Sequence, residues 1–139
     1  MGRTIGAVIG VWLVRTLVNW LYYGIYMADT FAELGERFPG VFREVVPAYI
    51  VADLLFAAVF VWLWTKVGSA FGGGAKGGAL YGVSIWLLAE AVTSIYYFYS
   101  FTYMTHAMWL SSVAVQLVVF VLMGVVAAAV RPVGAARAA

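Results

Sequence analysis

Three charged side chains lie inside long apolar stretches of the sequence, Arg15, Asp53 and Glu90, together with the uncharged polar residues Asn19 and Gln116. A charged residue within a membrane-spanning helix is costly, so it usually faces the interior of the helix bundle and has a partner there. With a helical rise of about 1.5 Å per residue, all five fall within a layer of about one helical turn near the bilayer midplane. The sequence therefore predicts a buried Arg/Asp/Glu layer.

The charge balance of this layer indicates its chemistry. With one arginine and two carboxylates, full ionisation would leave a net negative charge, which a low-dielectric medium disfavours. One carboxylate is then expected to hold a proton or to face a bound cation; we expect Glu90 to hold the proton and Asp53 to be hydrated. A carboxylate that holds a proton or faces a cation would suit proton coupling, or recognition of a cationic or hydroxylated ligand. In the alternative interpretation, Arg15 pairs with one or both carboxylates and the network only fixes the helix register.

Further polar residues continue along the same helix faces towards one end of the bundle. These stripes predict a polar cleft that leads from the charged layer to a cluster of aromatic residues. The predicted ligand- or proton-binding residues are therefore Arg15, Asn19, Tyr22, Asp53, Glu90, Ser94, Tyr97 and Gln116.

Other kinds of chemistry have little support in the sequence. The chain has no cysteine and a single histidine, His106, which excludes thiolate metal sites and a histidine metal cluster. We interpret His106 as a hydrated polar residue at the start of a helix, with haem or pigment ligation as the alternative. The segment GSAFGGGAKG lacks the GK[ST] of a phosphate-binding loop. We expect no cofactor and no metal, and an enzyme is the least supported class.

The elements that must position these residues follow from composition. The 139 residues are 65% hydrophobic and 10% charged, with a mean hydropathy of +0.99. A soluble domain is about half apolar and about a quarter charged. Segments of about 4–27, 47–67, 78–99 and 106–130 each reach the roughly 20 apolar residues that a spanning helix needs. The prediction is an all-α, four-helix transmembrane bundle forming a single domain over residues 1–139.

The positive charges predict the orientation of this bundle. With four spans, one side carries Arg3, Lys66, Lys76, Arg131 and Arg137, whereas the first loop mixes acidic and basic residues. The positive-inside rule then places both termini in the cytoplasm. We expect a multi-pass protein of the cell membrane, the inner membrane of a bacterium.

The first loop is expected to contain a short helix on the outer membrane surface. Thr30 and Glu33 fit a capping box at its start. Its apolar face would consist of Phe31, Leu34, Phe38, Val41, Phe42 and Val45. In the alternative interpretation, this helix is a lid packed across the bundle.

Glycines recur with a spacing of four at the start of two predicted spans, at Gly2, Gly6 and Gly10 and again in the stretch GAKGGALYG. Small residues at this spacing let helices approach closely in lipid. Both helices end in an aromatic cluster, WLYYGIY and SIYYFYS. This favours a two-helix unit repeated in parallel, with independent close packing at two sites as the alternative.

Three stretches of the sequence form a pattern: NWLYYGIYMADTFAEL, PAYIVADLLFAAVFVWLW and GGAKGGALYGVSIWL. In these three stretches the chain resembles small bacterial four-helix integral membrane proteins with no assigned role. The resemblance covers most of the chain and implies four spans but no activity. Small multidrug exporters are similar in size but carry their key glutamate in the first helix, where this chain has Arg15. The motifs of fluoride channels are absent.

Two functions are consistent with these patterns. The first is a small transport or ligand-binding protein, forming a homo-oligomer and coupled to protons, in which Asp53 and Glu90 titrate and Arg15 is the fixed counter-charge. The alternative is a non-catalytic accessory subunit of a larger membrane complex. The expected partners are the lipid bilayer and further membrane subunits. No basic run suggests nucleic acid.

Overall fold

The computed structural model of the protein describes residues 2–40 and 46–134. Within these ranges, four helical segments are long and apolar enough to cross a membrane: Gly2–Tyr26, Val46–Phe71, Gly74–Ser100 and His106–Val130. They confirm the four predicted spans, although the third begins at Gly74 rather than near residue 78. We conclude that the chain is an all-α, multi-pass membrane protein in contact with the lipid bilayer.

Three of the four spans change helix type along their length. The first is α1 (Gly2–Asn19) followed by the π-helix η1 (Trp20–Tyr26), and the short helix α2 (Ala28–Arg37) comes next. The second is α3 (Val46–Val67) with the 3₁₀ turn η2 (Gly68–Phe71). The third consists of α4 (Gly74–Trp86), the π-helix η3 (Leu87–Ala91) and α5 (Val92–Ser100), and the fourth is α6 (His106–Val130).

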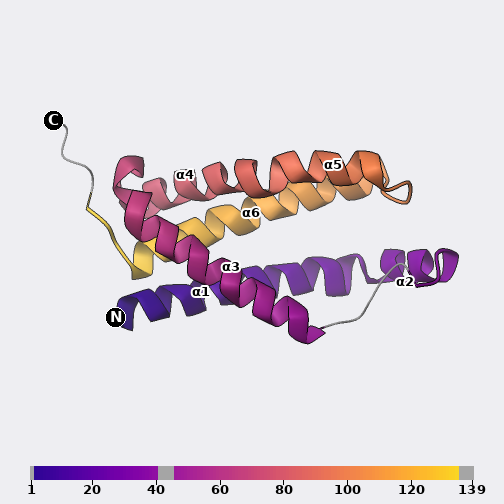
Figure 1. The fold of residues 1–139 in the computed structure, drawn as a ribbon, viewed down its shortest axis with the longest axis horizontal. Helices are drawn as coiled ribbons and strands as arrows, with labels where there is room; N and C mark the ends of the chain where they lie inside the picture. Colours follow the sequence, from indigo (N-terminus) through magenta and orange to yellow (C-terminus); the bar gives the residue numbers. More distant parts are fainter. Residues whose placement is uncertain (1, 41–45, 135–139) are drawn as a thin grey trace.

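Successive spans run in opposite directions, so the start of α1 and the end of α6 lie at the same end of the molecule (Figure 1). α6 is central, because α4 packs along one side of it and α1 along another. α3 crosses the bundle and packs mainly on α1. The fold thus places α1 between α3 and α6, and α6 between α1 and α4.

The contact between α4 and α6 depends on glycine. A Cβ atom at Gly78 would collide with the carbonyl oxygen of Gly124, and one at Gly82 with that of Phe120. Two of the three glycines predicted to form a packing face in this span therefore do so. The first, Gly74, has open space around it and a positive φ of 61°, so it belongs to the turn.

The glycine stripe of α1 faces α6. A Cβ at Gly10 would lie 2.9 Å from a methyl group of Val126, and one at Gly6 would lie 3.4 Å from Val130. Gly2 has nothing within 4 Å. α1 therefore contacts α6 through valine side chains, which is a looser contact than the backbone-to-backbone approach of α4.

The second half of α3 is anchored by an aromatic cluster. Phe60, Trp64, Tyr81 and Phe120 are all buried. The Tyr81 hydroxyl donates to the backbone oxygen of Phe60 at 2.6 Å, and the Trp64 indole donates to that of Arg131 at 2.8 Å. Both tyrosine and tryptophan thus bury their rings while satisfying their polar atoms, which fixes this half of α3 against α4 and α6.

The first loop does contain a short helix, α2, which extends beyond the bundle (Figure 1). The predicted capping box is wrong, because the helix begins at Ala28, before Thr30, and has no side-chain cap. The ring of Phe31 lies 6.1 Å from that of Tyr23, which ties α2 to the first span. The predicted positions Val41, Phe42 and Val45, and the charges Arg43, Glu44 and Arg137, lie outside the described residues.

Candidate functional site: a cleft between α1 and α3

An ion pair joins the first span to the second. The Arg15 Nε donates to Asp53 Oδ1 at 2.7 Å, and each side chain keeps 19% of its surface exposed. The guanidinium carbon of Arg15 also lies 4.4 Å from the centre of the Phe56 ring, a cation–π geometry. The pairing of Arg15 with a carboxylate, expected in the alternative interpretation of the sequence, is therefore present, with Asp53 as the partner.

The predicted buried layer of Arg15, Asp53 and Glu90 is wrong. Among the described polar and charged residues, the buried ones are Ser94 and Gln116, and neither carries a charge. Glu90 lies on η3, where Arg15 acts on it electrostatically, but no described lysine or arginine comes within 4.0 Å of it. The physical reason is the packing of the helices: α3, with Asp53, packs on α1, whereas the span that carries Glu90 packs along another side of α6 from α1.

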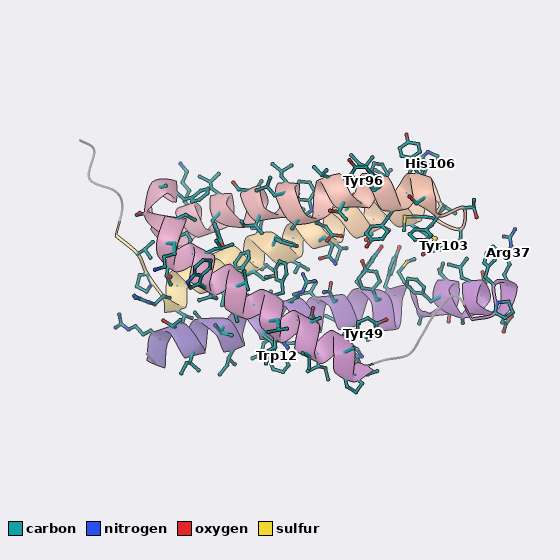
Figure 2. All side chains as sticks on the ribbon, viewed as in Figure 1. Trp12, Arg37, Tyr49, Tyr96, Tyr103 and His106 are labelled. Carbon is teal, nitrogen blue, oxygen red and sulfur yellow. The ribbon has the colours of Figure 1, made fainter. Side chains whose placement is uncertain are left out.

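The ion pair lines a cleft of about 570 Å³ between the first span and α3. Small-molecule sites typically have volumes of this order. The first span contributes Arg15, Thr16, Asn19, Trp20, Tyr23 and Gly24, α2 contributes Phe31, and α3 contributes Val46, Tyr49, Ile50 and Asp53. Tyr49 lies on the less packed half of α3 (Figure 2). The cleft exists because only the other half of α3 is anchored in the aromatic cluster.

Several polar atoms at the cleft have no hydrogen-bond partner in the described part of the chain. These include the buried Arg15 Nη1 and Thr16 Oγ1. A guanidinium has five N–H donors, and the Nε–H is the one that Arg15 uses. Asn19 accepts a hydrogen bond at its Oδ1, which leaves its amide N–H donors without a described acceptor. The polar floor of the cleft therefore has N–H donors, at Arg15 Nη1 and the Asn19 amide, that no described residue accepts.

Two residues of the predicted site, Tyr22 and Gln116, form hydrogen bonds between helices and do not line the cleft. The Tyr22 hydroxyl is 2.6 Å from the Ser111 hydroxyl, and the Gln116 amide donates to Asn19 Oδ1 at 2.8 Å. A third bond, at 2.9 Å, joins the hydroxyls of Tyr23 and Ser112. These bonds form a seam between the first span and α6, and the seam matches the alternative interpretation, in which polar residues fix the helix register.

Ser94 and Tyr97 lie away from the cleft. The Ser94 hydroxyl donates to the Ala91 carbonyl at 2.8 Å and accepts from the Trp109 indole at 3.2 Å, which links α5 to α6. Tyr97 is 53% exposed and stacks on Phe101. The structure thus places Arg15, Asn19 and Asp53 along the cleft. Gln116 touches the site through its bond to Asn19 without lining the cleft, and Tyr22, Glu90, Ser94 and Tyr97 do not line it either.

His106 also lies apart, at the end of the molecule where α5 meets α6 (Figure 2). Its ring packs edge-on against Phe98, with 4.7 Å between the ring centres. The described residues contain no group of three or more His, Cys, Asp or Glu side chains that could hold a metal ion.

Sequence reasoning missed the π-helix η1, which supplies Trp20, Tyr23 and Gly24 to the cleft. Its wider turn closes with the Met27 amide donating to the Tyr22 carbonyl at 2.9 Å. Short π segments are frequent at functional sites. The sequence signal for a special segment here was the pair of adjacent tyrosines in WLYYGIY, both of which bond to α6 in the structure. Such a pair fits equally well a belt of aromatic residues at the membrane–water interface.

Comparison of the chain with models of protein families gave no match, and comparisons with curated proteins and with solved structures gave none either. The resemblance to small bacterial four-helix proteins therefore gives no family assignment.

Proposed function

We propose that this multi-pass membrane protein is a transport protein that binds a small amphipathic solute in the cleft between α1 and α3. The observation that carries the proposal is the unequal use of the Arg15 guanidinium. It pairs with Asp53 through its Nε–H, while its buried Nη1 has no acceptor among the described residues. A bound solute or water must supply acceptors, because unpaired donors are costly in a low-dielectric medium.

The walls of the cleft support an amphipathic rather than a fully polar solute. Trp20, Phe31 and Ile50 line it together with Tyr23 and Tyr49, so the polar floor is surrounded by rings and aliphatic carbon. A few convergent polar groups within a mainly apolar pocket are typical of small-molecule sites. The ion pair would orient the polar head of the solute, and the apolar walls would hold its body.

The proposal includes coupling to protons through Asp53 and Glu90. Asp53 lines the cleft and Glu90 lies within the electrostatic influence of Arg15, so a proton on either carboxylate changes the field at the guanidinium. Transport that keeps the same dependence on a proton gradient in both Asp53→Asn and Glu90→Gln would contradict this coupling.

We also propose that both termini are cytoplasmic and that the cleft opens in the outer half of the membrane. Arg3, Lys66, Lys76 and Arg131 lie at the ends of spans that share one side, whereas α2 is mainly acidic. Because the chain has no cysteine, the single variants Glu33→Cys and Lys76→Cys can test this orientation. A membrane-impermeant maleimide should label the first in intact cells and leave the second unlabelled; the reverse pattern contradicts the orientation.

The proposed duplication has one supporting feature. The first and third spans each contain a π segment beyond their glycine stripe, η1 at the end of the first span and η3 in the middle of the third. The two hairpins would then be α1 with α3, and α4 with α6. Homo-oligomerisation stays a prediction, which mass measurement of the purified protein in lipid particles would test.

Solute retention tests the main proposal. The protein would be extracted with its lipids in polymer-bounded particles, and the bound small molecules identified by mass spectrometry. The critical variant is Arg15→Leu/Asp53→Leu, which removes both charges and leaves no unpaired one. Wild type should retain a solute in a fixed ratio to the chain, and the double variant should lose it.

A control variant, Trp62→Leu, changes an exposed side chain on α3 that does not line the cleft. It should retain the solute as wild type does. Identical small-molecule contents in wild type and in the double variant would overturn the proposal. A protein that purifies only with a stoichiometric partner chain, and with no solute, would support the accessory-subunit function instead.

A further inference from the structure

Resting on the proposed function, we infer that the solute is an uncharged amphiphile of the quinone class, with acceptor oxygens on a flat ring and an apolar tail. The juxtaposition that points to it is a pair of residues with N–H donors that no described residue accepts, Arg15 and Asn19, beside walls that include aromatic residues.

The donors determine which atoms the head group must present. Arg15 has N–H groups left after its single bond to Asp53, and the Asn19 amide has N–H groups left because its oxygen is taken by Gln116. An ammonium group cannot accept a hydrogen bond, so a cationic head would leave these donors unpaired. It would also gain little from Asp53, whose charge Arg15 already balances at 2.7 Å. The head group therefore presents oxygen acceptors.

The electrostatic field argues against a charged acceptor such as a carboxylate or phosphate. Around the Arg15–Asp53 pair, which is neutral overall, the cleft is bordered by α2, which carries three acidic residues and one arginine and reaches the cleft through Phe31. An anionic head group would lose its hydration and enter a region whose remaining charge is also negative, which is unfavourable. Carbonyl oxygens satisfy the donors without that penalty.

The walls determine the body of the solute. Trp20, Tyr23, Phe31 and Tyr49 present rings to the cleft, and rings of this kind favour a flat partner in stacked or edge-on geometry. Trp20 is 58% exposed and Tyr49 is 63% exposed, so the edge of the cleft is open to its surroundings. A ring with two carbonyl oxygens fits within about 570 Å³, and a tail can leave through this open edge into lipid.

Binding of three defined probes to the protein in phosphatidylcholine nanodiscs tests the inference. The probes are decylubiquinone, dodecyl phosphate and dodecyltrimethylammonium, which share an alkyl tail and differ in head group. Binding is measured by equilibrium partition, with empty nanodiscs to subtract uptake by lipid. Decylubiquinone should bind saturably, one per chain, whereas the charged probes should partition as they do into empty discs.

The cleft variants identify where the probe binds. Arg15→Leu/Asp53→Leu should weaken decylubiquinone binding about tenfold or more, because it removes charge-assisted hydrogen bonds, and Trp62→Leu should leave the binding unchanged. Saturable binding of either charged probe in place of decylubiquinone overturns the quinone class, and so does decylubiquinone binding that the double variant does not weaken. In each of these cases, solute retention by wild-type protein would leave the proposed function standing; loss of retention would contradict both.

Discussion

Replacing Arg15 and Asp53 separately and together should show that these residues act as a pair. Arg15→Leu leaves the Asp53 carboxylate without its partner, and Asp53→Leu leaves a guanidinium over the Phe56 ring with no counter-charge. The double variant removes both charges and fills the space with aliphatic carbon. Each single variant should therefore be less stable than wild type, and the double variant should be more stable than either.

The size of the effect follows from geometry and burial. Breaking a fully buried ion pair by removing one partner costs about 3–5 kcal/mol, whereas replacing both partners by apolar residues is often neutral or stabilising. Each side chain here keeps 19% exposure, so partial solvation reduces the cost. We expect each single variant to lose about 2 kcal/mol and the double variant to stay within about 1 kcal/mol of wild type.

Unfolding by sodium dodecyl sulfate in lipid–detergent micelles, followed by tryptophan fluorescence, measures these free energies. The double-mutant cycle gives the coupling energy, which should be about 3 kcal/mol or more, because the double variant loses far less than the two single variants together. Wild type, both single variants and the double variant are compared at one lipid composition. If the double variant lost the sum of the two single losses, the residues would be independent and the reasoning from the ion pair would fail.

Three further predictions concern the packing and the limits of the site. Gly82→Ala should destabilise the protein by about 2 kcal/mol or more in the same assay, because its Cβ would meet the Phe120 carbonyl, whereas Gly2→Ala, in open space, should not. Tyr22→Phe should cost about 0.6 kcal/mol, the average for a hydrogen bond between membrane helices; a loss above about 2 kcal/mol would indicate a role beyond the seam. Glu90→Gln should leave decylubiquinone affinity within about twofold of wild type, because Glu90 does not line the cleft and acts on the uncharged head group only through its field at Arg15; a tenfold loss in nanodisc binding would place it in the cleft.

The spans were predictable because hydropathy is a local property of the sequence. Pairing of Arg15 with a carboxylate was also predictable, since an isolated charge in lipid is so unfavourable. The rotation of each helix about its own axis was not, because it depends on contacts among all the helices. Glu90 therefore shares a predicted depth with Arg15 and Asp53 but does not join them within 4.0 Å.

The packing of α4 on α6 was only half predicted. Gly78 and Gly82 showed one face of the contact, but their partner on α6 was missed. Gly124 and Ala128, four residues apart, are a small-residue pair that could have revealed it. The π-helix η1 was missed for a different reason, because tertiary contacts, and not local propensity, decide whether one residue is inserted into a helical turn.

The same unequal packing of α3 explains both the cleft and its chemistry. Trp64 and Tyr81 hold the second half of α3 through buried rings and two hydrogen bonds. The first half packs on α1, where the bond from Arg15 to Asp53 is the polar contact between the two helices in the described ranges. A head group that accepts from Arg15 therefore binds beside the link that positions this half of α3. Coupling free energies are reciprocal. If binding of the solute shifts the position of α3, then a change that shifts α3 by other means must alter the affinity for the solute.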